Sequence, residues 1–108
     1  MDLSAQQIKT LERLQSAGFQ IVAFPLYANY VGVRKGNCAA LLAPALSGGF
    51  SMYSQPTLLI SGNFTVRVRQ GGRDFFVWKK ERLEATAARL AELDSFGREL
   101  ADSLLAVE

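Results

Sequence analysis

Histidine is absent from this sequence of 108 residues, and cysteine occurs once, as Cys38. Histidine is the commonest general base near neutral pH and the commonest metal ligand, so its absence removes the usual centre of a catalytic or metal site. A single thiol cannot close an internal disulfide, which excludes a disulfide-stapled secreted scaffold. We therefore expect no catalytic residue, no metal and no cofactor, and we interpret Cys38 as a small buried residue.

Long apolar runs are also lacking. The longest extends from Cys38 to Leu46, about half of what a membrane-spanning helix needs. The residues Met1 to Ser4 contain no basic stretch leading into an apolar one, so we expect no signal peptide. These absences favour a cytoplasmic protein with no membrane partner.

Charge is missing from large parts of the chain. No Lys, Arg, Asp or Glu occurs in the 31 residues from Gly36 to Val66, or in residues 14–33. Protein surfaces carry charge, whereas the centres of interfaces are depleted of it. The gap favours a homodimer formed by symmetric contact of sheet faces or edges. The alternative is a sheet buried on both sides within one chain, which is demanding for so short a protein.

The charges that are present are sorted along the chain. Residues 14–80 hold seven basic residues and one acidic residue, whereas residues 81–108 hold three basic and seven acidic residues. The net charge is only +2. The simplest interpretation is an acidic helix that lies beside basic strands and partly neutralises them.

The first structural signal is a helix. The chain is 49% hydrophobic and 20% charged, which is ordinary for a globular protein and fits a single domain over residues 1–108. Ser4 and Gln7 have the spacing of a capping box, and Gly18 is placed to end a helix in the left-handed conformation. Together these signals predict a helix over residues 5–17.

Glycine pairs then indicate a series of hairpins. Two-residue loops with strand-like flanks are expected at Gly36-Asn37, Gly62-Asn63 and Gly71-Gly72. The predicted strands cover residues 19–27, 30–35, 38–43, 57–61, 64–70 and 73–80. The result is an antiparallel β-meander of five to six strands. The loop 44–56 is long for a compact domain, so it either is functional or contains a short strand around Phe50–Tyr53.

A longer second helix is predicted from about Glu81 to Val107, because apolar residues there recur every three or four positions. Gly97 inside it costs about 1 kcal/mol relative to alanine and marks a candidate kink. Both helices should cover one face of the sheet, since each has a single apolar stripe to bury. The expected fold is therefore α+β, in the order α-β-β-β-β-β-β-α.

The loop positions fix the strand register, and side chains alternate between the two faces of the ribbon. One face is apolar and is expected to meet the helices: Leu59, Phe64, Val66, Val68, Phe75 and Val77. The other mixes cations with large apolar groups: Leu58, Ile60, Thr65, Arg67, Arg69, Asp74, Phe76, Trp78 and Lys80. On it, Arg67 should make a cation–π contact with Phe76 and Trp78, and Arg69 should pair with Asp74.

This mixed face is the candidate binding site, with binding residues Arg67, Arg69, Phe76, Trp78 and Lys80. The first hypothesis is a non-catalytic interaction domain that self-associates and presents the face to a protein or small ligand. The alternative is a domain that binds single-stranded nucleic acid, with the bases stacked on the same face. The low net charge and the acidic helix disfavour this alternative. If Trp78 is instead a core residue, loop 44–56 folds over this face. A third hypothesis is a pocket for a hydrophobic ligand under this loop.

Overall fold

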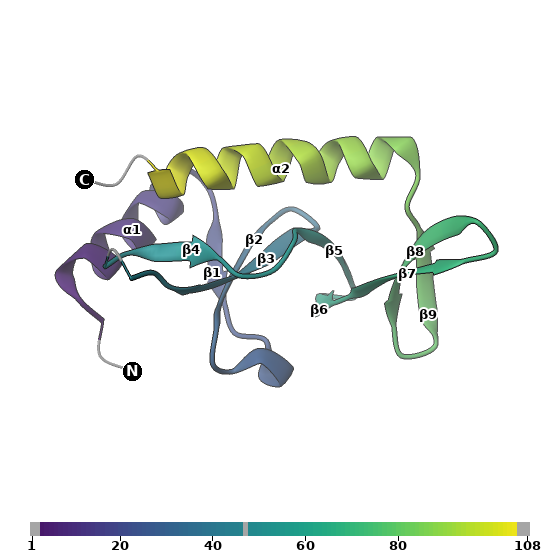
Figure 1. Cartoon of the computed structure of the whole chain (residues 1–108), viewed down its shortest axis with the longest axis horizontal. Coiled ribbons are helices and arrows are strands. Elements are labelled where there is room, and N and C mark those ends of the chain that lie inside the picture. The colour runs from purple at the N-terminus through teal and green to yellow at the C-terminus, as the bar shows by residue number, and fades with distance from the viewer. Residues whose placement is uncertain (1–2, 47, 106–108) are drawn as a thin grey trace.

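The computed structural model describes residues 3–46 and 48–105, and it has the predicted α+β class and element order (Figure 1). Helix α1 is Ala5–Ser16 and helix α2 is Ala87–Leu105. A short 3-10 helix, η1, covers Pro25–Tyr27. The strands are β1 (Gln20–Val22), β2 (Val31–Lys35), β3 (Cys38–Pro44), β4 (Phe50–Met52), β5 (Thr57–Ile60), β6 (Asn63–Phe64), β7 (Val66–Gln70), β8 (Arg73–Trp78) and β9 (Glu81–Glu84).

The strands form two antiparallel sheets rather than one meander. The first has the order β1-β2-β3-β5-β6, with β4 paired to β3, and the second has the order β7-β8-β9. The chain leaves the first sheet at Thr65, between β6 and β7. In Figure 1 the second sheet lies at one end of the molecule. Helix α2 begins near this sheet and runs along the first sheet.

Helix α1 begins as the sequence predicts. The Gln7 amide donates to Ser4 Oγ at 3.1 Å, and the Ser4 amide donates to Gln7 Oε1 at 2.9 Å, which completes the capping box. At the other end Gly18 has a φ of 96°, a conformation that glycine adopts without the steric cost of a Cβ.

Two of the three predicted hairpin loops are confirmed. Lys35 pairs with Cys38 across Gly36-Asn37, and Gln70 pairs with Arg73 across Gly71-Gly72. The predicted loop Gly62-Asn63 is wrong by one residue, because Ile60 pairs with Asn63.

The third loop is instead Ser61-Gly62. Both residues have positive φ, 51° and 79°, as a type I′ turn requires. The Asn63 side-chain amide donates to the Ile60 carbonyl at 3.2 Å, which holds Asn63 as the first residue of β6. A loop at Gly62-Asn63 would set Ile60 opposite Thr65, and this register is therefore also wrong.

The predicted start of the second helix at Glu81 is wrong as well. Glu81–Glu84 form strand β9, in which Glu81 pairs with Trp78 across Lys79-Lys80. This loop contains no glycine, although Lys79 has a φ of 54°. Helix α2 follows Thr86, whose hydroxyl accepts the Arg89 amide at 3.3 Å.

Three further expectations concern the loop and the last helix. The short strand expected near Phe50–Tyr53 is present as β4. The predicted helix end at Val107 lies outside the described residues. Helix α2 continues through Gly97 as one element to Leu105. Neither described helix combines the length and apolar character that crossing a membrane requires.

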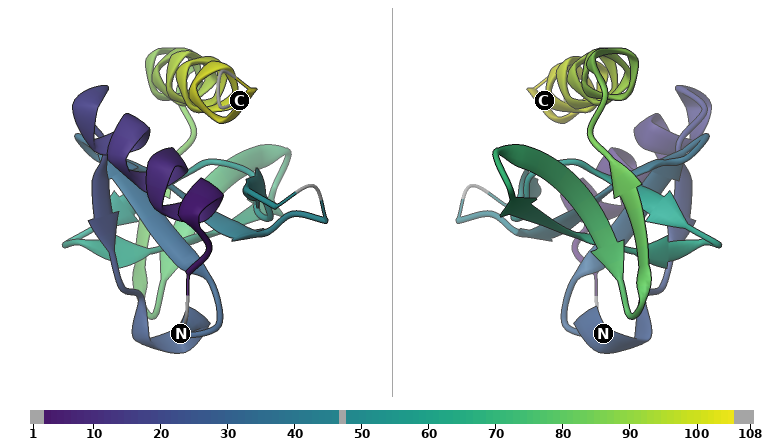
Figure 2. Two further views of the ribbon diagram at one scale, coloured as in Figure 1. Left: turned by 90° about the vertical axis from the view of Figure 1, so that its left-hand side faces the viewer. Right: turned by 90° about the vertical axis from the view of Figure 1, so that its right-hand side faces the viewer.

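The main core lies between the helices and one face of the first sheet. It includes Leu14 of α1, Phe96 and Leu100 of α2, and Val33 of β2. The opposite face of this sheet is covered by residues around η1, where Phe24 packs with Ala39, Leu41 and Leu59. Figure 2 shows α2 and η1 on opposite sides of the sheet.

Strand β3 is therefore buried on both faces from Cys38 to Leu42. A strand with both faces buried has no surface on which charge would be solvated. Burial within one chain thus explains the absence of charge from Cys38 to Leu42, and the homodimer stays a prediction.

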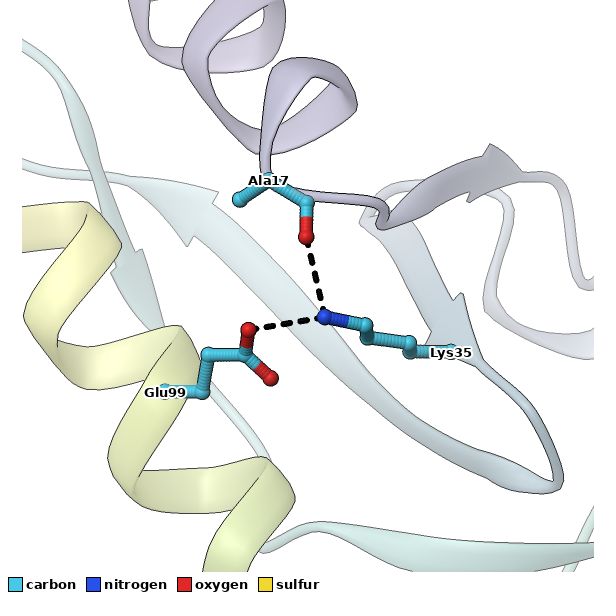
Figure 3. Close-up of polar contacts among 3 residues, drawn as sticks. All are labelled: Ala17, Lys35 and Glu99. Atoms are coloured by element: carbon cyan, nitrogen blue, oxygen red, sulfur yellow. Dashed lines mark hydrogen bonds and ion pairs between the residues drawn. The ribbon is translucent and has the colours of Figure 1, made fainter.

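Lys35 connects both helices to the first sheet (Figure 3). Its Nζ donates to the Ala17 carbonyl at the end of α1, at 2.9 Å, and to Glu99 of α2, at 2.7 Å. A cation beside the last carbonyls of a helix is favourably placed in the field of that helix. The ion pair also fits the sequence interpretation that the acidic helix lies beside basic strands.

Candidate binding groove

The structure inverts the predicted inside and outside of the β7–β8 hairpin. The register itself is confirmed, with Arg67 opposite Phe76 and Val68 opposite Phe75. However, Phe76 is 0% exposed and belongs to the main core, whereas Val66 is 55% exposed. Of the predicted apolar core face, Val68, Phe75 and Val77 are only partly buried.

The missed strand β9 accounts for much of this inversion. Leu83 of β9 pairs with Phe76 and packs against the same core, which adds a second apolar side chain beside Phe76 on the inner face of the second sheet. The hairpin was also expected to continue β5 and share its faces, but the chain changes sheets at Thr65. The hydrophobic alternation of β7 and β8 alone therefore could not identify the buried face.

Arg67 is the predicted binding residue with the most contacts. Its guanidinium carbon lies 5.9 Å from the centre of the Phe76 ring, as predicted, but the cation over Trp78 is Lys79 and not the predicted Arg67. Its Nη2 is 2.7 Å from Asp74 Oδ2, so the basic partner of Asp74 is Arg67 and not the predicted Arg69. Arg67 thus lies over a core aromatic ring while half of its side chain stays exposed.

The other predicted binding residues differ in how far they are exposed. Phe76 is buried and is not available to a ligand, so the prediction of an exposed Phe76 is wrong. Trp78 is partly buried, with Lys79 Nζ 5.4 Å from its ring centre. Arg69 and Lys80 are exposed. Bases could stack only on the partly covered Trp78, which weakens the nucleic-acid hypothesis.

Arg67 instead borders a groove of about 710 Å³ between α2 and the strands. On the helix side its lining includes Leu90, Leu93 and Gly97, and on the strand side it includes Pro56 and Phe64. This volume lies within the range of about 300–1,000 Å³ that is typical of small-molecule sites. The groove is mainly apolar, as such sites are.

Two threonine hydroxyls form part of the lining. Thr65 donates to the Leu58 carbonyl, and the Thr57 and Thr65 hydroxyl oxygens are 2.8 Å apart. Because the carbonyl oxygen can only accept, Thr65 uses its proton there and Thr57 must donate to Thr65. Thr57 Oγ1 then has lone pairs but no remaining proton.

The polar border of the groove contains both signs of charge. Arg67 pairs with Asp74, and Arg98 pairs with Asp94 at 3.0 Å. The Arg98 pair is largely exposed, and pairs of this kind contribute at most about 1 kcal/mol. The Arg98 guanidinium can therefore exchange its partner for the acidic group of a ligand, whereas the pair of Arg67 with Asp74 is less exposed.

Gly97 allows the helix to lie close to the strand side. A Cβ at this position would be 3.2 Å from Pro56 Cγ, closer than ordinary packing. Helix α2 is one helix through this point. The close approach of α2 to Pro56 therefore accounts for the glycine without the predicted kink.

Sequence reasoning missed the groove as a site, although it noted two of its markers. Gly97 stood out as a glycine inside a helix, and the long loop 44–56 suggested a nearby pocket. Met52 and Pro56, at the end of that loop, do line the groove. The third hypothesis, a hydrophobic ligand at this loop, comes closest to the geometry.

Cys38 is buried as expected, and the structure makes it an unreactive thiol. Burial, together with the nearby negative charge of Glu92 and a hydrogen bond to it, raises its pKa from 9.0 to about 11. Below pH 9 the thiol is neutral in both the folded and the unfolded chain. Between about pH 9 and 11 only the unfolded chain gives up this proton, so this group makes the fold less stable as pH rises.

Two measurements test this account of Cys38. Iodoacetamide should modify the native protein at pH 8 far more slowly than the urea-unfolded protein. The urea midpoint should fall more between pH 8 and pH 10.5 in the wild type than in Cys38→Ala. Equal alkylation rates, or equal pH dependence in the two proteins, would contradict a thiol with a raised pKa.

Within residues 3–46 and 48–105, no three His, Cys, Asp or Glu side chains come together as a candidate metal site. The sequence matches no protein-family model, no curated protein and no solved structure.

Proposed function

We propose that the protein is a non-catalytic binding domain whose ligand lies in the groove beneath α2. The single observation that carries the proposal is the groove itself, an apolar trough of about 710 Å³ with Arg67 and Arg98 among its lining residues. Sites of this kind use apolar walls for affinity and a few polar groups for orientation.

The lining favours an apolar ligand with one acidic group. Leu90, Leu93 and Phe64 would contact the apolar body. Arg67 and Arg98 would bind the acidic group through charge-assisted hydrogen bonds, which are stronger than neutral ones. A carboxylate on a short aliphatic chain is the simplest molecule with this chemistry.

Decanoate and decylamine form a matched pair of probes with opposite charge. Decanoate should raise the melting temperature and shift the NMR signals of Met52 and Leu93, because it binds only the folded chain. The Arg67→Ala and Arg98→Ala variants should each weaken decanoate binding about tenfold, the effect of losing roughly one charge-assisted bond.

Two control variants locate the site. Arg82→Ala removes a cation from β9 outside the groove lining, and it should leave decanoate affinity unchanged. Ala101→Leu adds bulk to the lining and should reduce the affinity of any occupant. Equal affinity for decanoate and decylamine, or an unchanged decanoate affinity in Ala101→Leu, would overturn the proposal.

A further inference from the structure

Strand β7 is an edge strand of the second sheet. Its hydrogen-bonded neighbour in the sheet is β8, and among the described residues no other backbone or side-chain group bonds to its main chain. An edge with unpaired N–H and C=O groups is a template on which another extended chain can pair.

The register identifies the unpaired groups. A two-residue loop closes on a pair that exchanges both hydrogen bonds, so Gln70 and Arg73 form such a pair. Bonded and non-bonded pairs alternate along the ladder, which makes Val68 opposite Phe75 the next bonded pair. Arg67 and Arg69 therefore point their N–H and C=O groups away from β8, toward the free edge.

The side chains of these two residues are also the cations of the strand. Arg67 and Arg69 lie on one face of β7, and Val66 and Val68 lie on the other, because side chains alternate. Strand β7 has no acidic residue. From Val66 to Glu84 there are six basic and three acidic residues, so the whole sheet is positively charged.

We propose that the β7 edge binds an extended acidic segment of a partner protein, which adds a fourth strand to this sheet. The partner would place Asp or Glu opposite Arg67 and Arg69 and apolar residues beside Val66 and Val68. The four free backbone groups of the two arginines would supply the pairing, and charge would select the partner. This proposal goes beyond the groove ligand, since it depends on Arg69 and on main-chain groups that do not line the groove.

A second copy of this chain fits the edge poorly. Antiparallel pairing centred on Val68 would place Arg67 of each copy opposite Arg69 of the other. Parallel pairing in register would set each arginine beside its own counterpart. Like charges directly opposite are destabilising, so the arginines oppose self-pairing while they favour an acidic strand.

The test uses two capped peptides of about nine residues, a typical strand length. One alternates valine with glutamate and the other alternates valine with lysine. At saturation the glutamate peptide should slow amide hydrogen exchange at Arg67 and Arg69 at least about tenfold, because their N–H groups become bonded. The Val68 amide is already bonded to β8 and should change little.

Variants separate the charge from the main-chain pairing. Arg69→Ala keeps the N–H group and should weaken the glutamate peptide about threefold to tenfold through lost charge. Arg69→Pro also removes that N–H at an edge, where proline is tolerated, and should weaken binding further. The matched control Arg82→Ala, on the opposite edge strand, should have little effect.

Peptide chemistry keeps the test informative if the proline variant unfolds. N-methylation of the peptide residues that face β7 should abolish binding, whereas N-methylation of the alternate residues should leave it intact. Binding without slowed exchange at Arg67 and Arg69, or equal binding of the lysine peptide, would overturn the proposal. Ala101→Leu should affect decanoate and not the peptide, so failure of one site is distinguishable from failure of the other.

Discussion

Replacing Phe76 with alanine should lower the free energy of unfolding by about 3–5 kcal/mol, the range for truncating a fully buried phenylalanine. The ring is 0% exposed and packs into the main core that α2 covers. Its removal would leave a cavity where the second sheet meets the core, and Arg67 would lose the ring beneath its guanidinium. Urea unfolding followed by circular dichroism measures the change.

The matched control is Val66→Ala, in the neighbouring strand of the same hairpin. Val66 is 55% exposed, so its truncation should change stability by no more than about 0.5 kcal/mol. The sequence alone favoured the opposite ranking, with Val66 in the core and Phe76 at the surface. A larger loss for Val66→Ala than for Phe76→Ala would refute the inside–outside assignment given by the structure.

A single added methyl group at Gly32 should also destabilise the protein, by about 1–3 kcal/mol, as overpacking does. A Cβ there would lie 2.6 Å from the Val22 carbonyl oxygen and 2.6 Å from the Phe24 ring. The carbonyl belongs to the main chain of the paired strand, since Val22 is opposite Gly32, and cannot rotate away. Urea unfolding of Gly32→Ala measures the loss.

Two further variants identify the cause of that loss. Gly49→Ala is the control, because its nearest contact would be an ordinary 3.5 Å to Thr10 Oγ1, and stability should change little. In the Phe24→Ala background the cost of Gly32→Ala should shrink, since one of the two clashing groups is gone. An unchanged cost there would assign the whole effect to the Val22 carbonyl.

Local signals in the sequence predicted the elements whose causes are local. The Ser4–Gln7 capping box identified the first helix, and Gly71-Gly72 identified both a hairpin and its register. The loop Lys79-Lys80 was missed because neither residue is a turn former, so β9 was read as the first turns of the helix. The positive φ of Lys79 is imposed by its surroundings and has no signature in the sequence.

The candidate groove was beyond sequence reasoning for a different reason. Its lining comes from α2, from the end of loop 44–56 and from the β6–β7 segment, which only the tertiary fold brings together. Arg67 was identified because a cation beside an aromatic residue is visible in a hairpin register. The sequence predicted that Arg98 belongs to the solvated face of the helix, and nothing in the sequence related it to Arg67.

The position of α2 along the chain has a consequence for biosynthesis. It follows every strand, yet Leu93, Phe96 and Leu100 complete the core above the sheet. At about 5–20 residues per second, a ribosome needs roughly one to four seconds to add this 19-residue helix. During that interval the main core lacks the cover of α2, and the nascent chain is most open to chaperones and to aggregation.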